Sequence, residues 1–371
     1  MAYEKKFMER AIELAKKGTG AVSPNPLVGA VIVKNGKVIG EGYHMEYGGP
    51  HAERNALASV SENESAEGAE MYVTLEPCCH TGNQPPCTDA IIEAKIKRVY
   101  VGSDDPNPLV AGKGIWKLRS AGVEVVTHVM KAECDAMNTF FFHYITHNTP
   151  YVLYKYAMTM DGKICTSTGK SRWISNTESR KTIHVLRDKC AAIMVGIGTV
   201  LADDPLLNCR IENGHDPIRI ICDSHLRIPM DSQIVQTAGE IKTYVAALAS
   251  IESEKKEKIQ QLKEHGIGTL LLPADEFGHI DVNSLMNQLG RMKIDSLLLE
   301  GGGQVGWSMF REDLIDEVYT FISPKVFGGT GASPVGGEGI DEVDNAAHFS
   351  LKDITTLDGD IMIHYVRRKE D

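Results

Sequence analysis

The sequence predicts an α/β protein built from two consecutive domains. Short apolar runs of strand length alternate with longer segments of helical period, which is typical of strands layered with helices. The chain has 371 residues, more than one domain of usual size holds. A new strand begins at Pro150, after the last helical segment of the first half. We therefore predict one domain over residues 1–147 and another over residues 148–371.

The composition indicates a globular protein of a reducing compartment. Hydrophobic residues make up 42% and charged residues 24% of the chain, and no apolar run approaches the roughly 20 residues of a membrane span. The N-terminus has the pattern of an amphipathic helix and lacks a signal-peptide core. Eight cysteines form no regular disulfide framework, which favours the cytoplasm. A net charge of −11 argues against broad binding to nucleic acid or anionic membranes.

The elements of the first domain follow from local patterns. Residues 3–17 have helical period and end in Lys16-Lys17-Gly18, a typical helix C-terminus. Asn35-Gly36 predicts a hairpin turn between strands at 30–33 and 38–42. Further strands are predicted at 69–75, 98–102 and 123–126, and further helices from His51, from Thr88, at 115–121 and at 131–147. This order predicts three layers, α/β/α, with Phe140, Phe141, Phe142 and Tyr144 packing in the core or between domains.

Four residues of this domain predict a catalytic zinc site. His51, Cys78 and Cys87 supply one imidazole and two thiols, and three ligands leave the fourth tetrahedral position of zinc open. Zinc lowers the pKa of a bound water, and the Glu53 carboxylate can then carry protons. His-x-Glu followed by Pro-Cys and a further Cys is the signature of zinc-dependent deaminases.

The spacing of His51 and Glu53 places them at a helix start. Residues i and i+2 of a continuous helix lie about 200° apart, so the two side chains share one site only where the helix begins. Pro50 directly precedes His51, and proline is favoured at helix starts. The positive end of a helix also favours thiolate and hydroxide.

The choice of thiols leaves alternatives. Eight residues separate Cys78 from Cys87, and Cys79 and His80 among them are other possible ligands. We favour Cys78, which follows Glu76-Pro77, and Cys87, which directly precedes a predicted helix. A structural zinc or inert buried thiols would not explain Glu53, and a structural site recruits a fourth ligand.

The second domain repeats the alternation of strands and helices. Strands are predicted at 150–154, 190–196, 218–222, 242–247, 296–300, 317–322 and 361–366. Helices are predicted at 175–188, with Ser175 or Asn176 as N-cap, at 252–265 and at 304–313. The continuous apolar run at 190–196 predicts a central strand.

Two glycine-rich loops in this domain follow strands and precede helices. They are Gly196-Ile-Gly198-Thr and Gly301-Gly-Gly-Gln-Val-Gly306. Free backbone N–H groups at a helix start favour a phosphate, although neither loop has the full dinucleotide pattern and tight turns alone could explain either. Together they predict nucleotide phosphate binding.

The combined motifs resemble those of the bifunctional deaminase–reductase family of riboflavin biosynthesis. In the first half these are Asn25-Pro-Leu-Val-Gly, His51-Ala-Glu53, Leu75-Glu-Pro-Cys-Cys-His and Pro85-Pro-Cys87. In the second half they are Ala157-Met-Thr-Met-Asp-Gly-Lys, Ser171-Arg-Trp-Ile, 195–205 and Leu299-Glu-Gly-Gly. One departure is Cys79, where the family usually has Ser. The resemblance implies a cytidine-deaminase-like three-layer domain followed by a dihydrofolate-reductase-like α/β domain.

The resemblance also implies two reactions, with Zn²⁺ and NADPH as cofactors. The first removes the 2-amino group of 2,5-diamino-6-ribosylamino-4(3H)-pyrimidinone 5′-phosphate, with Glu53 as proton shuttle. The second reduces the ribosyl group to ribityl, which gives 5-amino-6-ribitylaminouracil 5′-phosphate. We expect a homo-oligomer that acts on this small molecule and binds neither nucleic acid nor membrane.

Further site residues are implied by the same resemblance. The NADPH site would consist of Ala157, Trp173, Thr199, Asp203, Gly302, Gly303, Gln304, Val305 and Gly306. The reducible substrate would contact Ser171, Arg187, Leu207, Arg210 and Glu300, with Lys155 polarising the sugar. A guanidinium suits a phosphate because it forms two parallel hydrogen bonds. Asn25, His44 and His80 would help to hold the base or phosphate of the deaminase substrate, although a loop Asn more often caps a turn.

Three other functions fit parts of this pattern. A nucleic-acid or nucleoside deaminase would explain the zinc motif, but it leaves the second domain without a role. That domain could instead be a non-catalytic binding or oligomerisation module. A structural zinc protein would explain the thiols but leaves Glu53 without a role.

Overall fold

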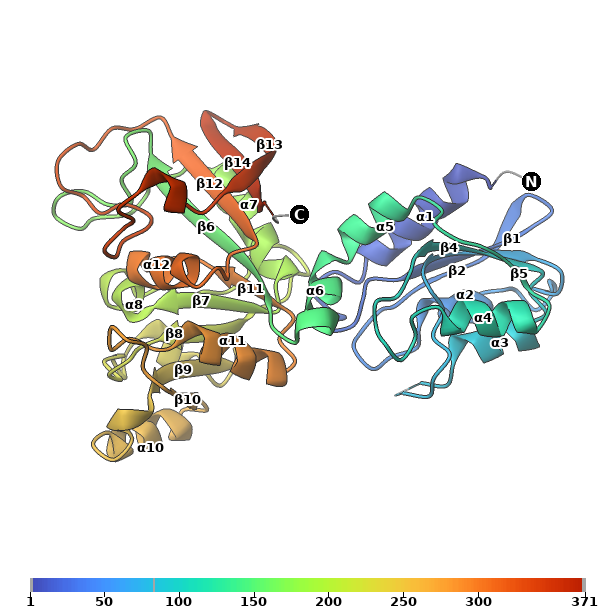
Figure 1. Ribbon diagram of the computed structural model, residues 1–371, viewed down its shortest axis with the longest axis horizontal. Helices are drawn as coiled ribbons and strands as arrows, with labels where there is room; N and C mark the ends of the chain where they lie inside the picture. Colours follow the sequence, from blue (N-terminus) through green and yellow to red (C-terminus); the bar gives the residue numbers. More distant parts are fainter. Residues whose placement is uncertain (1–2, 83, 369–371) are drawn as a thin grey trace. The chain divides into compact units, whose positions relative to one another are not determined.

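The computed structural model describes residues 3–82 and 84–368, and the chain divides into two compact units (Figure 1). Unit 1 is Met1–Asn148 and unit 2 is Thr149–Asp371. The assignment of deamination to residues 1–147 and reduction to residues 148–371 stays a prediction. Across the described ranges no helix is both long and apolar enough to cross a bilayer.

The sheet of unit 1 combines an antiparallel hairpin with parallel strands. Its order is β2-β1-β3-β4-β5. The strands are β1 (Gly29–Lys34), β2 (Lys37–Tyr43), β3 (Glu70–Leu75), β4 (Arg98–Ser103) and β5 (Glu124–Val126). The predicted turn is confirmed, because Asn35 and Gly36 both have positive φ and β1 pairs antiparallel to β2. β3, β4 and β5 are parallel.

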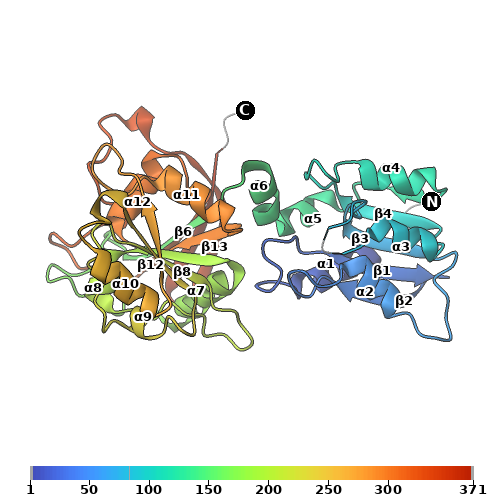
Figure 2. The same ribbon diagram turned by 90° about the horizontal axis from the view of Figure 1, so that it is seen from below.

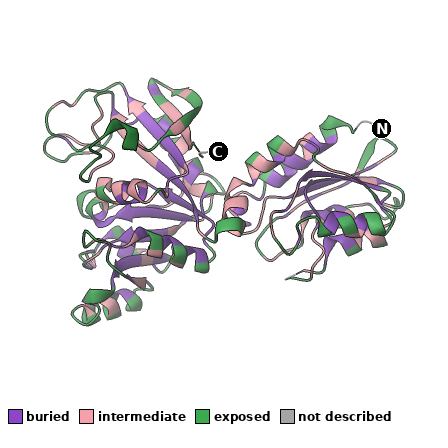
Figure 3. Ribbon diagram, viewed as in Figure 1, coloured by how far each residue is buried: buried purple, intermediate pink, exposed green. Residues whose placement is uncertain are grey.

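Helices cover both faces of this sheet. On one face α1 (Lys5–Lys16) and α5 (Lys131–Met137) pack against Tyr72 and Tyr100. On the other face α2 (Ala52–Ala58), α3 (Cys87–Glu93) and α4 (Lys113–Ser120) pack against Met71 and Val99. Figure 3 shows the buried strands between two sets of helices whose outer sides are exposed. The predicted three-layer α/β/α fold is confirmed.

The predicted helical conformation of residues 131–147 is confirmed, with one interruption. The structure has two helices, α5 and α6 (Thr139–His147), separated at Asn138. The buried Asn138 side chain bonds both the N–H of Leu27, at 2.8 Å, and its C=O, at 2.9 Å. The backbone leaves helical geometry where this contact forms. In the aromatic cluster of α6, Phe141 is buried in the core of unit 1.

Unit 2 contains a larger sheet of order β10-β9-β8-β7-β11-β6-β12-β14-β13. Its strands are β6 (Tyr151–Thr159), β7 (Ala192–Gly196), β8 (Ile218–Cys222), β9 (Thr243–Leu248), β10 (Gly268–Leu272), β11 (Ser296–Leu299), β12 (Glu317–Ser323), β13 (Phe349–Leu357) and β14 (Asp360–Arg367). Neighbours from β10 to β12 are parallel, whereas β14 and β13 are antiparallel. β7 lies between β8 and β11, so the predicted central strand is confirmed. β6 runs to Thr159, beyond its predicted end, because β12 pairs with it over that length.

The helices of unit 2 follow from the strand order. They are α7 (Thr177–Lys189), α8 (Ile197–Asp203), α9 (Gln233–Gln236), α10 (Lys256–Glu264), α11 (Val282–Arg291) and α12 (Gly303–Arg311). From β6 to β10 the strand-to-strand connections run one way across the sheet, and from β10 to β12 they return. Right-handed crossovers therefore place α7 to α10 on one face and α11 and α12 on the other, as Figure 2 shows. Asn176, not Ser175, caps α7, since its side chain accepts from the N–H of Ser179.

Candidate functional site

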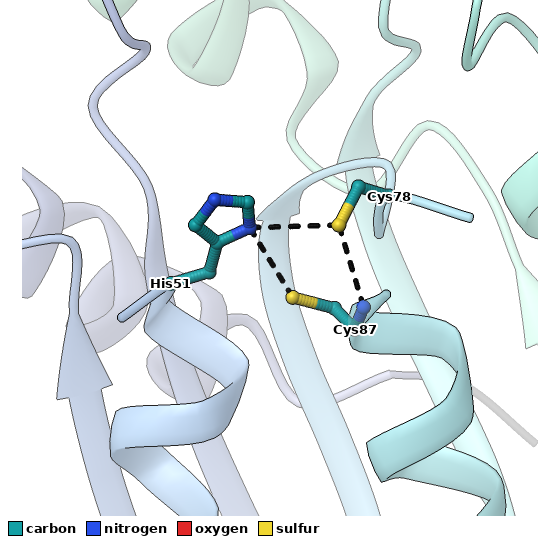
Figure 4. Close-up of side chains that lie close together, drawn as sticks. All are labelled: His51, Cys78 and Cys87. Atoms are coloured by element: carbon teal, nitrogen blue, oxygen red, sulfur yellow. Dashed lines mark hydrogen bonds between the residues drawn. The ribbon is translucent and has the colours of Figure 1, made fainter. Parts of the chain in front are cut away.

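Three side chains from separate segments of unit 1 meet in one cluster (Figure 4). His51 is the N-cap of α2, Cys87 is the first residue of α3, and Cys78 lies in the segment after β3. The Nδ1 atom of His51 is 3.5 Å from the Sγ of Cys78 and 3.3 Å from the Sγ of Cys87. Nitrogen and sulfur ligands of a tetrahedral zinc lie about 3.6 Å apart, given the usual bond lengths. The donor set and its spacing therefore fit a zinc ion.

The electrostatics of the cluster favour a cation. Hydrogen bonds from the Cys87 side chain and from His51 lower the pKa of Cys78. The bond with Cys78 and burial raise the pKa of Cys87, because two adjacent thiolates repel each other. The starts of α2 and α3 also direct their positive ends toward the cluster. A divalent cation would stabilise both thiolates together.

Glu53 lies in the first turn of α2 and is 3% exposed. Burial, followed by the negative charge of Cys78, raises its pKa to about 7. A carboxyl group with a pKa near neutrality can both accept and donate a proton. Among the described residues, the group of possible metal ligands consists of His51, Cys78 and Cys87, so Glu53 is left for this task.

The two alternative ligands lie outside this group. The Sγ of Cys79 faces the carbonyl oxygen of Leu109, 4.0 Å away. Burial raises the pKa of Cys79, which disfavours the thiolate form that metals bind. His80 lines the neighbouring cavity, and its buried Nδ1 atom has no hydrogen-bond partner among the residues that the structure describes.

A cavity of about 200 Å³ opens beside the cluster. The three predicted substrate residues of the deaminase, Asn25, His44 and His80, all line it together with His51 and Glu53. The Nδ1 of His44 lies 3.0 Å from the carbonyl oxygen of Pro50 and must donate to it. Its Nε2 therefore accepts from the Asn25 Nδ2, 3.0 Å away. The Asn25 Oδ1 atom is consequently the part of this amide left to accept a hydrogen bond.

Asp105 and Asn107 are among the other polar residues that line the cavity, and the sequence patterns had not predicted a role for them. Both follow β4, and Asp105 accepts a hydrogen bond of 2.8 Å from the N–H of Asn107. Burial raises the pKa of Asp105 to about 6. Polar residues directly after a buried parallel strand were the available signal, since ligands bind at such strand ends.

The predicted cofactor residues of unit 2 gather at the carboxyl ends of parallel strands. Gly196 ends β7, and its N–H donates to the carbonyl oxygen of Gly301, which follows β11, at 3.3 Å. A Cβ at Gly301 would lie 3.4 Å from the Thr199 hydroxyl, and one at Gly302 would lie 3.1 Å from the Gly196 nitrogen. The two predicted glycine loops thus lie against each other at the starts of α8 and α12. The first turn of α12 is formed by the second loop, with Gly303, Gln304, Val305 and Gly306. Ala157 lies near the end of the neighbouring β6.

Three charged side chains form a buried network beside these loops. Arg187 Nε and Nη2 donate to Glu300 at 2.6 and 2.8 Å, and Lys155 Nζ lies 3.8 Å from the same carboxylate. Burial lowers the pKa of Lys155 despite the nearby Glu300. Because Arg187 also donates to the carbonyl oxygen of Asn208, its fork is already occupied. Arg210 also has a partner, because its Nε donates to the Oδ1 of Asn208 at 3.0 Å. Binding of a phosphate by either arginine stays a prediction.

The remaining predicted residues of unit 2 have clear positions. Ser171 donates to Asp203 at 2.7 Å. Trp173 is 62% exposed, so it is not a core residue, and its ring stacks on the Arg180 guanidinium. Leu207 is buried with positive φ. His184, which sequence reasoning missed, has its pKa lowered to about 4 by burial and by the charges of Arg187 and Arg210.

Comparisons with known proteins match both units. The model of the cytidine and deoxycytidylate deaminase zinc-binding region matches residues 1–103. The model of the RibD C-terminal domain matches residues 150–363.

Full-length relatives carry both halves in the same order. The chain is 50% identical to the riboflavin biosynthesis protein RibD of Actinobacillus pleuropneumoniae over 97% of this chain and 94% of the relative. Its identity to RibD of Escherichia coli is 37%, over 97% of this chain and 98% of the relative. A Thermotoga maritima structure, a diaminohydroxyphosphoribosylaminopyrimidine deaminase/5-amino-6-(5-phosphoribosylamino)uracil reductase, matches with a TM-score of 0.87 and 38% identity over 98% of each chain.

Proposed function

This chain belongs to the RibD family of riboflavin biosynthesis proteins, and we propose how its residues perform the two reactions of a bifunctional deaminase and reductase. Unit 1 would deaminate 2,5-diamino-6-ribosylamino-4(3H)-pyrimidinone 5′-phosphate. Unit 2 would then reduce the ribosyl group with NADPH, which gives 5-amino-6-ribitylaminouracil 5′-phosphate. The observation that carries the proposal is the cluster of His51, Cys78 and Cys87 with the buried Glu53 beside it.

In the deaminase, His51, Cys78 and Cys87 would hold zinc. When bound, zinc would lower the pKa of a coordinated water and supply hydroxide near neutral pH. Glu53, whose pKa burial raises to about 7, would take up a proton and deliver it to the leaving amine. Asn25 would accept a hydrogen bond from the pyrimidine through Oδ1, in the orientation that His44 fixes. His80 would contact the base or the phosphate.

In the reductase, NADPH would supply hydride. It would be bound by Ala157, Thr199, Asp203 and the loop over 302–306, and Trp173 would cover the exposed side of the cofactor. Lys155 would polarise the open-chain carbonyl or imine of the sugar, because burial lowers the pKa of its ammonium group and makes it a stronger acid. The substrate would contact Ser171, Arg187, Leu207, Arg210 and Glu300.

The deciding experiment supplies purified protein with the diaminopyrimidine phosphate, with and without NADPH. We expect ammonia in both reactions and NADPH oxidation only in the second. His51→Ala should abolish ammonia release but still reduce separately supplied deaminated intermediate. Ammonia release from tRNA or single-stranded DNA, with none from the pyrimidine phosphate, would favour a nucleic-acid deaminase. If NADPH does not bind, unit 2 is a non-catalytic module.

We also propose a cytoplasmic homo-oligomer that binds neither nucleic acid nor membrane. All eight cysteines are free, in keeping with a reducing compartment, and the net charge is −11. Sedimentation of the full chain tests the oligomeric state.

A further inference from the structure

Glu76 is a buried carboxylate that lies two residues before the proposed zinc ligand Cys78. It follows the end of β3 and is 3% exposed. Burying an ionised carboxylate is costly unless hydrogen bonds compensate for the lost water. Its position and its partners therefore require an explanation that the two proposed reactions do not give.

The partners of Glu76 are backbone groups at the start of α4. Its Oε1 accepts from the N–H groups of Gly114, at 3.0 Å, and Ile115, at 3.1 Å. Its Oε2 accepts from the N–H of Gly112 at 3.0 Å. The first N–H groups of a helix have no partner within the helix, and α4 has no capping side chain of its own, since Gly112 is its N-cap. Glu76 therefore caps α4 from a distant segment, where the helix dipole also favours its charge.

The same helix start also lies against the backbone that leads to Cys78. A Cβ at Gly114 would overlap the carbonyl oxygen of Pro77, so only glycine allows this approach. On the other side, the carbonyl oxygen of Cys78 accepts from the N–H of Thr88 at 3.1 Å. The short segment that carries Cys78 is thus held between α4 and α3.

We propose that Glu76 is a positioning residue that fixes Cys78 in the geometry that zinc requires, by anchoring the Pro77-Cys78 segment to the start of α4. This inference rests on the proposed zinc site. Removing the anchor leaves all three ligands in the chain but lets the Cys78 thiol move. Groups that hold metal ligands in place typically contribute 10- to 100-fold to metal affinity, and we expect Glu76 to lie in that range.

The test compares the zinc affinity of full-length variants by competition with a chromogenic chelator. Glu76→Gln keeps the shape of the side chain and the Oε1 acceptor, but it places an NH₂ group, which cannot accept, against the N–H of Gly112. We expect the Kd of this variant for zinc to rise at least tenfold. His51→Ala gives the baseline for zinc bound elsewhere. Arg119→Ala is the matched control, because it removes a hydrogen bond of 3.0 Å to Val125 at the other end of α4 and should leave zinc affinity unchanged. Co²⁺ absorption should show a disturbed tetrahedral site in Glu76→Gln and an intact one in the control.

The outcomes separate this inference from the proposed function. If the unaltered chain binds zinc no better than His51→Ala, the zinc site itself is refuted. If it binds zinc and Glu76→Gln binds equally well, Glu76 is only a helix cap. Glu76→Asp, which keeps the charge but shortens the reach, replaces Glu76→Gln if that chain does not fold. Failure of both variants to fold also overturns the proposal, because the carboxylate would then stabilise the domain and not the ligand.

Discussion

Arg187 and Glu300 are joined by two parallel hydrogen bonds of 2.6 and 2.8 Å, although they are 113 positions apart in the chain. Their side chains are only 12% and 6% exposed. Because Glu300 is also 3.8 Å from Lys155, the pair sets the charge around the residue proposed to polarise the sugar. Arginine holds a carboxylate in a fixed plane, which lysine cannot do.

We expect Arg187→Lys to lower kcat/KM for reduction of the deaminated intermediate at least tenfold, about 1.4 kcal/mol of transition-state stabilisation. Ammonia release by the same preparation should not change, which provides an internal control. Arg291→Lys, at the exposed end of α11, is the matched control. An unchanged rate of NADPH oxidation in Arg187→Lys would show that the pair has no part in reduction.

A second prediction concerns the hydrogen bonds that connect Pro50, His44 and Asn25. Burial lowers the pKa of His44, and its neutral ring accepts from Asn25 at 3.0 Å. Asn25→Asp replaces this donor with an acceptor, so His44 must gain a proton and its pKa should rise. Proton NMR of the imidazole measures that shift.

The same variant should release ammonia at least tenfold more slowly at neutral pH with its zinc content unchanged, since a buried hydrogen-bonding group that loses its partner costs about 1–3 kcal/mol. Asn63→Asp adds the same charge at an exposed position of unit 1 and should behave like the unaltered chain. A normal rate for Asn25→Asp would remove Asn25 from substrate binding.

Local chemistry in the sequence predicted much of unit 1. Asn35-Gly36 predicted its hairpin, and Pro50 placed His51 at a helix start, where the structure has it as the N-cap of α2. The helix predicted immediately after Cys87 begins at Cys87 itself. Short-range signals therefore placed His51 and Cys87, two residues of the cluster, at helix starts.

Contacts between distant segments could not be predicted in the same way. Nothing near Glu76 indicates a partner 38 residues later, and nothing near Arg187 indicates Glu300. β13 was not predicted because most of its residues are exposed at the edge of the sheet, so it has no apolar pattern. α11 was not predicted either, although its sequence carries a helix signal: an Asp281 cap followed by Leu285, Met286 and Leu289 on one buried face.

A third prediction follows from the raised pKa of Asp105, about 6 instead of 3.8. The folded chain holds this proton more firmly than the unfolded chain. The stability that Asp105 contributes is therefore full below pH about 4 and is lost as pH rises through about 6, by at most roughly 3 kcal/mol. Asp105→Asn removes this titration and keeps the hydrogen-bond acceptor for Asn107.

The measurement is the free energy of unfolding of unit 1 in both chains at several pH values. Denaturant unfolds the protein, and hydrogen exchange of the β3 and β4 amides monitors unit 1. The contributions of other titrating groups to stability cancel when the free energy of unfolding of the unaltered chain is subtracted from that of Asp105→Asn. We expect the advantage of Asp105→Asn to grow between pH about 4 and 7. A constant difference would mean that Asp105 ionises as readily in the folded chain as in water.

The last prediction concerns the contact between the two glycine loops of unit 2. Gly302 has φ +88, and a Cβ there would lie 3.1 Å from the nitrogen and 3.3 Å from the Cα of Gly196. Gly302→Ala is thus strained twice, by its backbone conformation and by this contact. It should separate the two helix starts that are proposed to bind the cofactor phosphates and raise the Kd for NADPH at least tenfold.

Gly239→Ala is the control, because Gly239 has open space around its Cβ position and no positive φ. Fluorescence titration with NADPH compares the variants, and ammonia release verifies that unit 1 is intact. Equal NADPH affinity in both variants would place the cofactor phosphates elsewhere.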